Sequence, residues 1–326
     1  MNKMRKAVIA SNEVSELVSW ELGGYKQKVL LDGKSKDAPV IIFLHGGPGS
    51  PFPFSEGCRG MFPDITERFI MVYWDQLGCG INNHPIDDHF ACGHFVDMTV
   101  DLIQEVKKKF PDNAVNLFGV SWGSVLALKA SCRVPELLHR VLVYGQVLRE
   151  LSFNKEVYAE LEQAKMSGRQ KEKLAVIKAR EEHTLDDFKQ MAGWIRKYTQ
   201  GYQAKDGGKL PFGSMLVSLL TSPDYSFRDL KAVMVNGYQK NKSLLQEIMV
   251  MDLWEDLERV TIPYLIMQGS CDIVTSTKTM KQFMENTKNP YVTMQLIEHN
   301  GHIPGATGME QIIEKGFDFL TASGNE

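Results

Sequence analysis

The segment Val-Asn-Leu-Phe-Gly-Val-Ser-Trp-Gly-Ser-Val-Leu-Ala-Leu-Lys-Ala at residues 115–130 decides how the rest of the chain is interpreted. Its first four residues form an apolar, partly β-branched run that predicts a buried strand. Residues 124–130 are rich in Ala and Leu and predict a helix. Between them lies a Gly-x-Ser-x-Gly motif, whose small flanking residues allow strand and helix backbones to approach closely. This context predicts that Ser121 is a nucleophile, held clear of the sheet near the positive end of the helix.

The composition of the 326-residue chain is that of a globular protein, with 43% hydrophobic and 24% charged residues. The net charge of −3 gives no basic excess of the kind that nucleic-acid binding requires. The short apolar run near the N-terminus predicts no signal peptide, and no later stretch predicts a membrane span. Five irregularly spaced cysteines favour reduced thiols in a cytoplasmic protein over a disulfide framework. We therefore expect neither a nucleic acid nor a membrane as partner.

Strand and helix patterns alternate over most of the chain. Residues 7–31 alternate apolar and polar side chains around Gly23-Gly24, which predicts an antiparallel hairpin or edge pair. Further strands are predicted, several of them from continuous apolar runs typical of parallel sheets, at 40–44, 69–74, 141–144, 264–267 and 291–297. Helices are expected at about 94–110, 275–286 and 309–322.

Residues 147–255 differ from the segments on either side, because they show helical patterns and no convincing strand. Apolar residues recur there at spacings of three and four. Thr184 with Asp187 and Ser226 with Asp229 look like N-terminal capping boxes. The alternation on both sides predicts an α/β fold, a mostly parallel central sheet with helices on both faces, formed by residues 1–146 and 256–326. Residues 147–255 are predicted to form a helical cap, or lid, over it.

Two of the predicted strands are followed by residues that could activate a serine. A serine nucleophile needs a base, and the base needs a group that fixes its tautomer. Asp272 lies just past the strand at 264–268, and His299 and His302 follow the strand at 291–297. We favour His302 as the base, because Gly301 suits a loop that reaches into a site at the carboxyl ends of the strands. Asp272 could instead cap a helix or a turn, but the order Ser121, Asp272, His302 is the one used with this serine motif.

A reacting carbonyl oxygen also needs two hydrogen-bond donors that are already in place. One is expected to be the backbone N–H of Trp122, which follows the nucleophile. The other is expected from the loop after residues 40–44, where Gly46-Gly47-Pro48-Gly49 leaves the backbone open for close approach.

Together these motifs resemble the prolyl aminopeptidase (proline iminopeptidase) family of α/β-hydrolases. The resemblance rests on His-Gly-Gly-Pro-Gly at 45–49, Asp-Gln-x-Gly-x-Gly at 75–80, Gly-x-Ser-Trp-Gly-Ser at 119–124, Asp272 and Gly301-His302, and it covers about 30–145 and 255–322. It implies a serine peptidase that removes an N-terminal residue, often proline, from short peptides without cofactor or metal. It also implies a triad of Ser121, Asp272 and His302, with Gly47 and Trp122 as oxyanion donors.

The chain departs from the family pattern beside the predicted site. Leu77 stands where the family usually has Arg, Ile81-Asn82-Asn83 where it has Ser, and Val120 where it has Gly. These changes leave the triad intact, so they bear on the substrate. In that family, glutamates of the cap bind the free amine of the substrate. The candidates here are Glu150, Glu160, Glu181 and Glu182, each of which also fits a solvated helix face.

Other functions use some of the same features. An esterase or amidase acting on small acyl substrates would need the same triad and oxyanion donors, and a non-catalytic ligand-binding protein could share the fold. His84, His89, Cys92 and His94 lie close in sequence, but their spacing fits no compact tetrahedral metal site, so we expect no metal. The partner expected is a small-molecule or short-peptide substrate.

Overall fold

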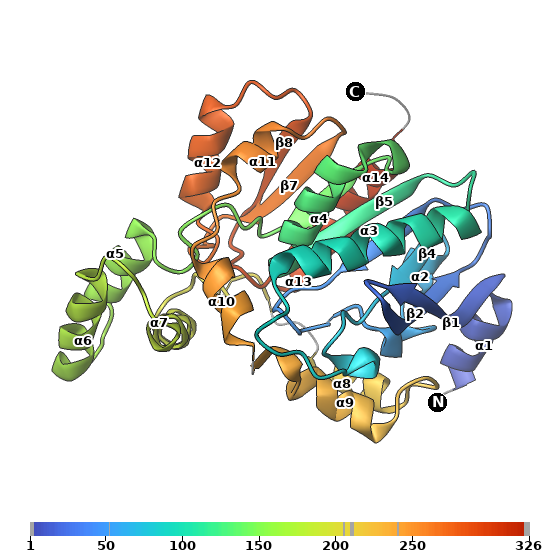
Figure 1. The fold of residues 1–326 in the computed structure, drawn as a ribbon, viewed down its shortest axis with the longest axis horizontal. Coiled ribbons are helices and arrows are strands. Elements are labelled where there is room, and N and C mark those ends of the chain that lie inside the picture. The colour runs from blue at the N-terminus through green and yellow to red at the C-terminus, as the bar shows by residue number, and fades with distance from the viewer. Residues whose placement is uncertain (1–2, 52, 205, 209–211, 240, 323–326) are drawn as a thin grey trace.

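The computed structural model describes residues 3–51, 53–204, 206–208, 212–239 and 241–322, and its centre is one eight-stranded sheet (Figure 1). The strands lie in the order β1-β2-β4-β3-β5-β6-β7-β8. Their bounds are β1 Val14–Leu22, β2 Tyr25–Gly33, β3 Val40–Leu44, β4 Ile70–Tyr73, β5 Val115–Val120, β6 Val141–Tyr144, β7 Tyr264–Gly269 and β8 Val292–Ile297. β1 and β2 form an antiparallel hairpin, β2 is antiparallel to β4, and the later neighbours are parallel. The predicted mostly parallel α/β sheet is confirmed.

The predicted start of the hairpin, at residue 7, is wrong. Helix α1 (Lys3–Ser11) covers the first of these residues, and the hairpin begins at Val14. Arg5 on α1 is buried and donates to the carbonyl oxygens of Arg59 at 2.6 Å and Gly57 at 2.5 Å. These partners lie more than 50 residues away, so the contacts that hold the helix cannot be seen in the local pattern.

The sheet is covered on both faces, which explains the continuous apolar runs of its central strands. Along β3, Val40, Ile42 and Leu44 pack into the larger core, against α3 (Cys92–Lys109) and α4 (Trp122–Arg133), which cross in front of the sheet in Figure 1. Ile41 and Phe43 pack into a second core on the opposite face.

Helix α12 (Thr277–Asn286) packs into the larger core as well, through Met280 and Phe283. The second face is covered by α2 (Pro63–Thr66), α13 (Ala306–Gln311) and α14 (Phe317–Thr321), with a π-helical turn at Ile312–Gly316 between the last two. Short 3-10 turns occur at Glu56–Cys58, Gly80–Asn82, Pro135–Leu137 and Gly237–Gln239. No helix in the described part of the chain is long and apolar enough to cross a membrane.

Between β6 and β7 the described residues contain helices and no strand. These are α5 (Lys155–Gln163), α6 (Gly168–Lys178), α7 (Leu185–Tyr198), α8 (Phe212–Leu220), α9 (Phe227–Met234), α10 (Lys242–Met249) and α11 (Trp254–Glu258). Both predicted capping boxes are present: Thr184 caps α7 and Ser226 caps α9, with Asp187 and Asp229 returning the hydrogen bonds.

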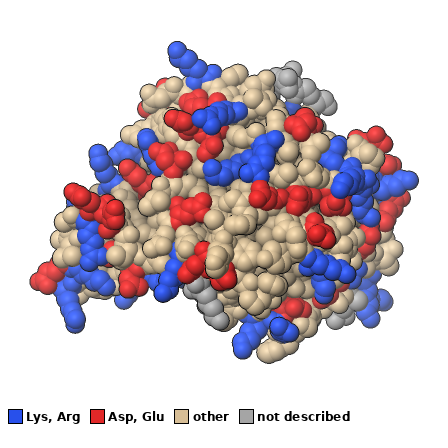
Figure 2. Space-filling model, viewed as in Figure 1, with Lys and Arg blue, Asp and Glu red and all other residues tan. Residues whose placement is uncertain are grey.

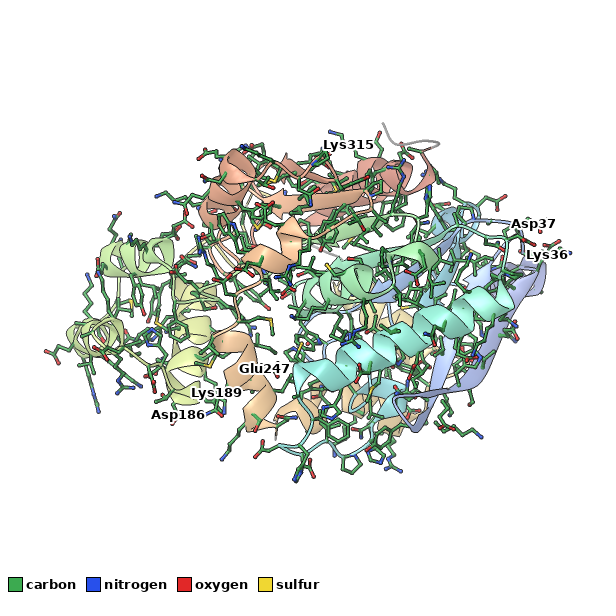
Figure 3. The ribbon with its side chains drawn as sticks, turned by 45° about the horizontal axis from the view of Figure 1, so that its top comes forward. Lys36, Asp37, Asp186, Lys189, Glu247 and Lys315 are labelled. Carbon is green, nitrogen blue, oxygen red and sulfur yellow. The ribbon has the colours of Figure 1, made fainter. Side chains whose placement is uncertain are left out.

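The helical region has two parts in space (Figure 1). Helices α5, α6 and α7 project to one side and share an apolar cluster that includes Leu161, Leu174 and Trp194. Helices α8 and α9 pack against each other beside the sheet. Helix α10 contacts both α7 and α3. It is held to the sheet region by Glu247 (Figure 3), which accepts a hydrogen bond of 2.8 Å from the N–H of Cys92 at the start of α3.

Acidic and basic side chains are interspersed over the face of the molecule shown in Figure 2. Several ion pairs join exposed side chains, such as Lys178 with Glu162 and Arg259 with Glu255. Pairs of this kind contribute little to stability, at about 0–1 kcal/mol each.

Candidate active site

Ser121 lies at a sharp turn between β5 and α4, in a backbone conformation with φ 52° and ψ −118°. A positive φ is costly for a residue with a side chain, by about 1–3 kcal/mol, and persists only where the surroundings impose it. The two motif glycines make the turn possible. A Cβ on Gly123 would lie 1.8 Å from the carbonyl oxygen of Leu44, and one on Gly119 would lie 2.6 Å from the oxygen of Gly123.

The three residues of the predicted triad are brought together from three strand ends. His302 Nε2 lies 2.9 Å from Ser121 Oγ, and His302 Nδ1 lies 3.0 Å from Asp272 Oδ2. When Nδ1–H donates to Asp272, Nε2 carries the lone pair and can accept the serine proton. The arrangement is therefore a continuous chain of hydrogen bonds from the hydroxyl to the buried carboxylate.

Asp272 is held in one orientation by its neighbours. Its Oδ1 accepts the N–H groups of Val274 at 2.8 Å and Thr275 at 3.1 Å. Its Oδ2 accepts the Thr275 hydroxyl at 2.7 Å and the Gln268 amide at 3.1 Å, beside the imidazole. The side chain of Asp272 is buried, so water does not compete with these donors and the carboxylate keeps its orientation toward His302.

His302 and His299 differ in what surrounds them. His299 is exposed, and its N–H donates to Ser270 Oγ at 3.0 Å. His302 is buried, and its loop is fixed by helical-region residues: the N–H of His302 donates to Gly201 O at 2.9 Å and the N–H of Ile303 to Tyr202 O at 2.8 Å. Of the two histidines, His302 is the one within hydrogen-bond distance of Ser121.

The glycine loop after β3 lies directly against the serine. A Cβ on Gly46 would lie 3.0 Å from Val120 O and 3.3 Å from Ser121 Cβ, which leaves little room for a side chain there. Gly47 has φ 118°, and the N–H of Ser50 closes the turn by donating to Gly46 O at 3.1 Å. Trp122 is the first residue of α4, so no carbonyl within its own helix can accept its N–H.

A buried polar network joins this loop to the serine turn. The N–H of Gln76 donates to His45 Nε2 at 3.0 Å, its amide donates to His45 O at 3.1 Å, and its oxygen accepts the Trp122 indole at 2.9 Å. Burial lowers the pKa of His45 to about 4, so the ring stays neutral. His45 and Gln76 both belong to the glycine-rich motifs at 45–49 and 75–80, but no pattern in the sequence assigns them a role.

A second network ties the helical region to the loop after β4. The hydroxyl of Tyr225, just before α9, donates to Asp75 Oδ2, and Asp75 Oδ1 accepts the N–H of Glu56 at 3.2 Å. Burial raises the pKa of Asp75 to about 6 and that of Glu56 well above its ordinary value. The adjacent Asp224 forms a two-bond ion pair with Arg59, at 2.5 and 2.9 Å. Glu56 and Arg59 carried no sequence signal, since isolated charged residues usually indicate a solvated surface.

A cavity of about 520 Å³ lies beside the serine, between the strand ends and helices α8 and α9. The residues that line it are mostly apolar, and none of the described ones is charged. They come from the sheet region (Phe43, Ser50, Pro53, Phe54, Phe118, Val120, Tyr144), from the helical region (Tyr202, Gln203, Leu216, Leu219, Leu230, Val233, Met234) and from the segment after His302 (Ile303, Pro304, Met309, Ile312).

The four candidate glutamates lie elsewhere. Glu150, Glu160, Glu181 and Glu182 are exposed, and none of them lines this cavity. Glu150 borders a separate polar pocket with Arg149, Lys155 and Ser276. A role for any of them in binding a substrate amine stays a prediction.

Comparisons with known proteins agree with this architecture. The alpha/beta hydrolase fold family matches residues 39–308. The probable aminopeptidase YbaC of Bacillus subtilis is 22% identical over 316 residues, 92% of each chain. A proline iminopeptidase of Lactobacillus crispatus is 23% identical over 309 residues, 89% of this chain and 93% of that one. The crystal structure of a proline iminopeptidase from Mycobacterium smegmatis has a TM-score of 0.58 at 16% identity, covering 94% and 95% of the two chains.

Proposed function

The chain belongs to the alpha/beta hydrolase fold family, and from that membership we propose that it is a serine hydrolase that cleaves an ester or amide bond through an acyl-enzyme. The observation that carries the proposal is the chain of hydrogen bonds from Ser121 Oγ through His302 to Asp272. A serine in a strained turn with an imidazole nitrogen 2.9 Å from its hydroxyl oxygen is the arrangement expected of an activated nucleophile.

Each residue of the site has a role in this reaction. Ser121 Oγ attacks the carbonyl carbon while its proton passes to His302 Nε2, and Asp272 stabilises the imidazolium that forms. The oxygen of the tetrahedral intermediate accepts hydrogen bonds from the backbone N–H groups of Trp122 and Gly47. His302 then returns the proton to the leaving amine or alcohol. A water molecule, deprotonated by His302, then hydrolyses the acyl-enzyme and regenerates Ser121. The cycle consumes one water molecule per substrate and needs no cofactor.

Within this class the relatives favour an aminopeptidase that releases an N-terminal residue, proline or another small or apolar residue, from short peptides. Two curated relatives that span about nine-tenths of the chain are named aminopeptidase and proline iminopeptidase. We propose residues 147–255 as the cap that admits such substrates, over a core of residues 1–146 and 256–326. The proposed cytoplasmic location rests on the sequence.

A second candidate, an esterase or amidase acting on small acyl substrates, is favoured by one observation. The cavity beside Ser121 is lined by apolar side chains with no carboxylate among the described residues, and the candidate glutamates are exposed. An α-ammonium group in such a cavity would lack a charged partner, and an unpaired buried charge is unfavourable.

A matched pair of arylamides separates the two candidates. An aminopeptidase should cleave an aminoacyl arylamide with a free amine about a hundredfold more efficiently, in kcat/KM, than its N-acetylated form. That factor corresponds to the loss of a charged contact, about 2–3 kcal/mol. Ser121→Ala should abolish turnover of both. Equal rates on the two arylamides, both dependent on Ser121, would support the esterase or amidase instead.

A further inference from the structure

The apolar cavity opens next to the reacting atoms. It is lined by Val120 and Ile303, the chain neighbours of Ser121 and His302, and by Ser50 at the end of the glycine loop. A substrate group that enters it is therefore attached close to the bond under attack.

The floor of the cavity is aromatic and rigid. Phe54 packs edge-on against Phe43, with ring centroids 5.0 Å apart, and Phe43 lies 5.4 Å from Phe118. All three rings are buried in the core on this face of the sheet. Edge-to-face contacts at these distances add to the gain from burial, so the floor is part of the folded core.

The opposite wall comes from α8 and α9, and its position is fixed at both ends of α9. Before this helix, Asp224 pairs with Arg59 and Tyr225 donates to Asp75. After it, the Asn236 amide donates to Gly49 O at 2.7 Å. The wall residues Leu219, Leu230 and Val233 are thus held over the floor by contacts outside the cavity.

The cavity is much larger than a proline ring requires. Benzene occupies an apolar cavity of about 150 Å³, and this cavity is about 520 Å³. By proportion a completely filled cavity of this size would hold about twenty carbon atoms, so an apolar group of about ten fits within it. Its size falls within the range of about 300–1,000 Å³ that is usual for small-molecule pockets.

The mouth of the cavity is apolar as well. Leu216 and Met234 line it, yet they are 56% and 76% exposed. Beside them on α8 and α9, Val217, Leu220 and Phe227 are also more than half exposed. An apolar group longer than the cavity would therefore pass out over apolar surface.

From these observations we propose that the cavity receives the acyl side of the substrate, and that this group is large, uncharged and apolar: a chain or ring system of about ten carbons. The proposal rests on the serine-hydrolase chemistry above. Because the proposed acyl group carries no ammonium, it favours the esterase or amidase over the aminopeptidase. Val233 on α9 is proposed to limit the length of the group.

Fluorophosphonates with alkyl chains from ethyl to dodecyl test this directly, because each reports a rate of covalent labelling. We expect the labelling rate constant to rise about two- to fourfold per added methylene until about ten carbons, as expected for burial of each group. Equal rates at every length would overturn the proposed acyl group. Absence of labelling at every length would instead contradict the serine-hydrolase proposal, so the two failures are distinguishable.

A matched pair of variants locates the group. In Val233→Phe, which fills the cavity, the ratio of decyl to ethyl labelling rates should fall at least tenfold. In Val235→Phe the same change is made at an exposed residue outside the lining, and the ratio should be unchanged. An unchanged ratio in folded Val233→Phe, or equal losses in both variants, would contradict the assignment. If Val233→Phe does not fold, Val233→Ala should move the optimum to longer chains, and an unmoved optimum would contradict it.

A charged probe tests the absence of charged groups from the described lining. A decyl probe that ends in a carboxylate or an ammonium group should label about a hundredfold more slowly than one that ends in a methyl group, because the cavity offers no described ion partner. Equal rates would show that the chain end does not enter the cavity and would overturn the proposal.

Discussion

The chain of hydrogen bonds at Ser121 and the cavity beside it are adjacent in space, but they are built differently. The first is fixed by backbone: a strained serine, glycines that no larger residue could replace, and a carboxylate held by two N–H groups. The second is built mainly by side chains, seven of the eighteen from a helical region tied to the sheet region by a few polar contacts. Backbone constraints of the first kind leave motifs in a sequence, whereas apolar walls do not.

This difference suggests how such a chain can change substrate while it keeps its chemistry. Substitutions at Val233 or Leu230 alter the volume beside Ser121 without touching a hydrogen bond of the site. Substitutions at Gly123 or Asp272 alter the backbone or the base itself. The predictions below separate these two kinds of effect.

The largest effect is expected from Ser121→Ala. Removal of the nucleophile should lower kcat by about a million-fold, to the rate that binding and the oxyanion donors alone supply. The measurement is steady-state turnover of the best arylamide or ester. Turnover within tenfold of the wild type would mean that another residue carries the reaction.

Asp272→Asn should lower kcat by about ten-thousand-fold while the protein stays folded, because the amide favours the wrong tautomer of His302. Asp186→Asn is a suitable control, since Asp186 is exposed on α7 (Figure 3) and its replacement should leave kcat unchanged. A folded Asp272→Asn enzyme with near-normal kcat would show that a different group orients the base.

The sequence predicted the structure best where a residue is constrained by atoms close to it in the chain or in the sheet. Gly119 and Gly123 are required by contacts within a few residues of Ser121 and by one neighbouring strand, so their motif predicted the turn correctly. Asp272 and His302 could be placed together because parallel strands end at one edge. Helix α1 was missed because Arg5 is held by residues near position 58. No local pattern marks Glu56 as buried or Val233 as part of a cavity wall, because the residues that surround them come from distant parts of the chain.

A third prediction concerns the loop network and pH. The pKa of His45 is about 4 in the folded protein against 6.5 ordinarily, so between these values the unfolded chain binds more protons. Lowering the pH from 6.5 to 4 should therefore destabilise the fold by about 3 kcal/mol through this residue, and above pH 6.5 the contribution should be level.

Urea unfolding of the wild type and His45→Gln between pH 4 and 7.5 measures this contribution. Asp75, with its raised pKa, gives a slope of opposite sign, but it is present in both proteins and cancels in the difference. The exposed His84→Gln variant should keep the full wild-type slope. A His45→Gln protein that also keeps that slope would mean that the buried ring is not the source.

The smallest effects are expected from two glycines, Gly123 beside Ser121 and Gly193 in helix α7. Gly123→Ala should lower the free energy of unfolding by about 3 kcal/mol, because the new methyl group meets the Leu44 carbonyl. Gly193→Ala should raise it by about 0.5–1 kcal/mol, because Gly193 lies within α7 with no described atom near the new methyl group. Thermal unfolding of both variants checks the signs, and destabilisation by Gly193→Ala would show that α7 packs more tightly than described.

Mass spectrometry after treatment with an alkyl fluorophosphonate identifies the residue that attacks the substrate. We expect one adduct per chain, located by peptide mapping on Ser121, and its loss in Ser121→Ala. Wild-type protein without an adduct, or an adduct on another residue that persists in Ser121→Ala, would contradict the assignment of Ser121 as the nucleophile.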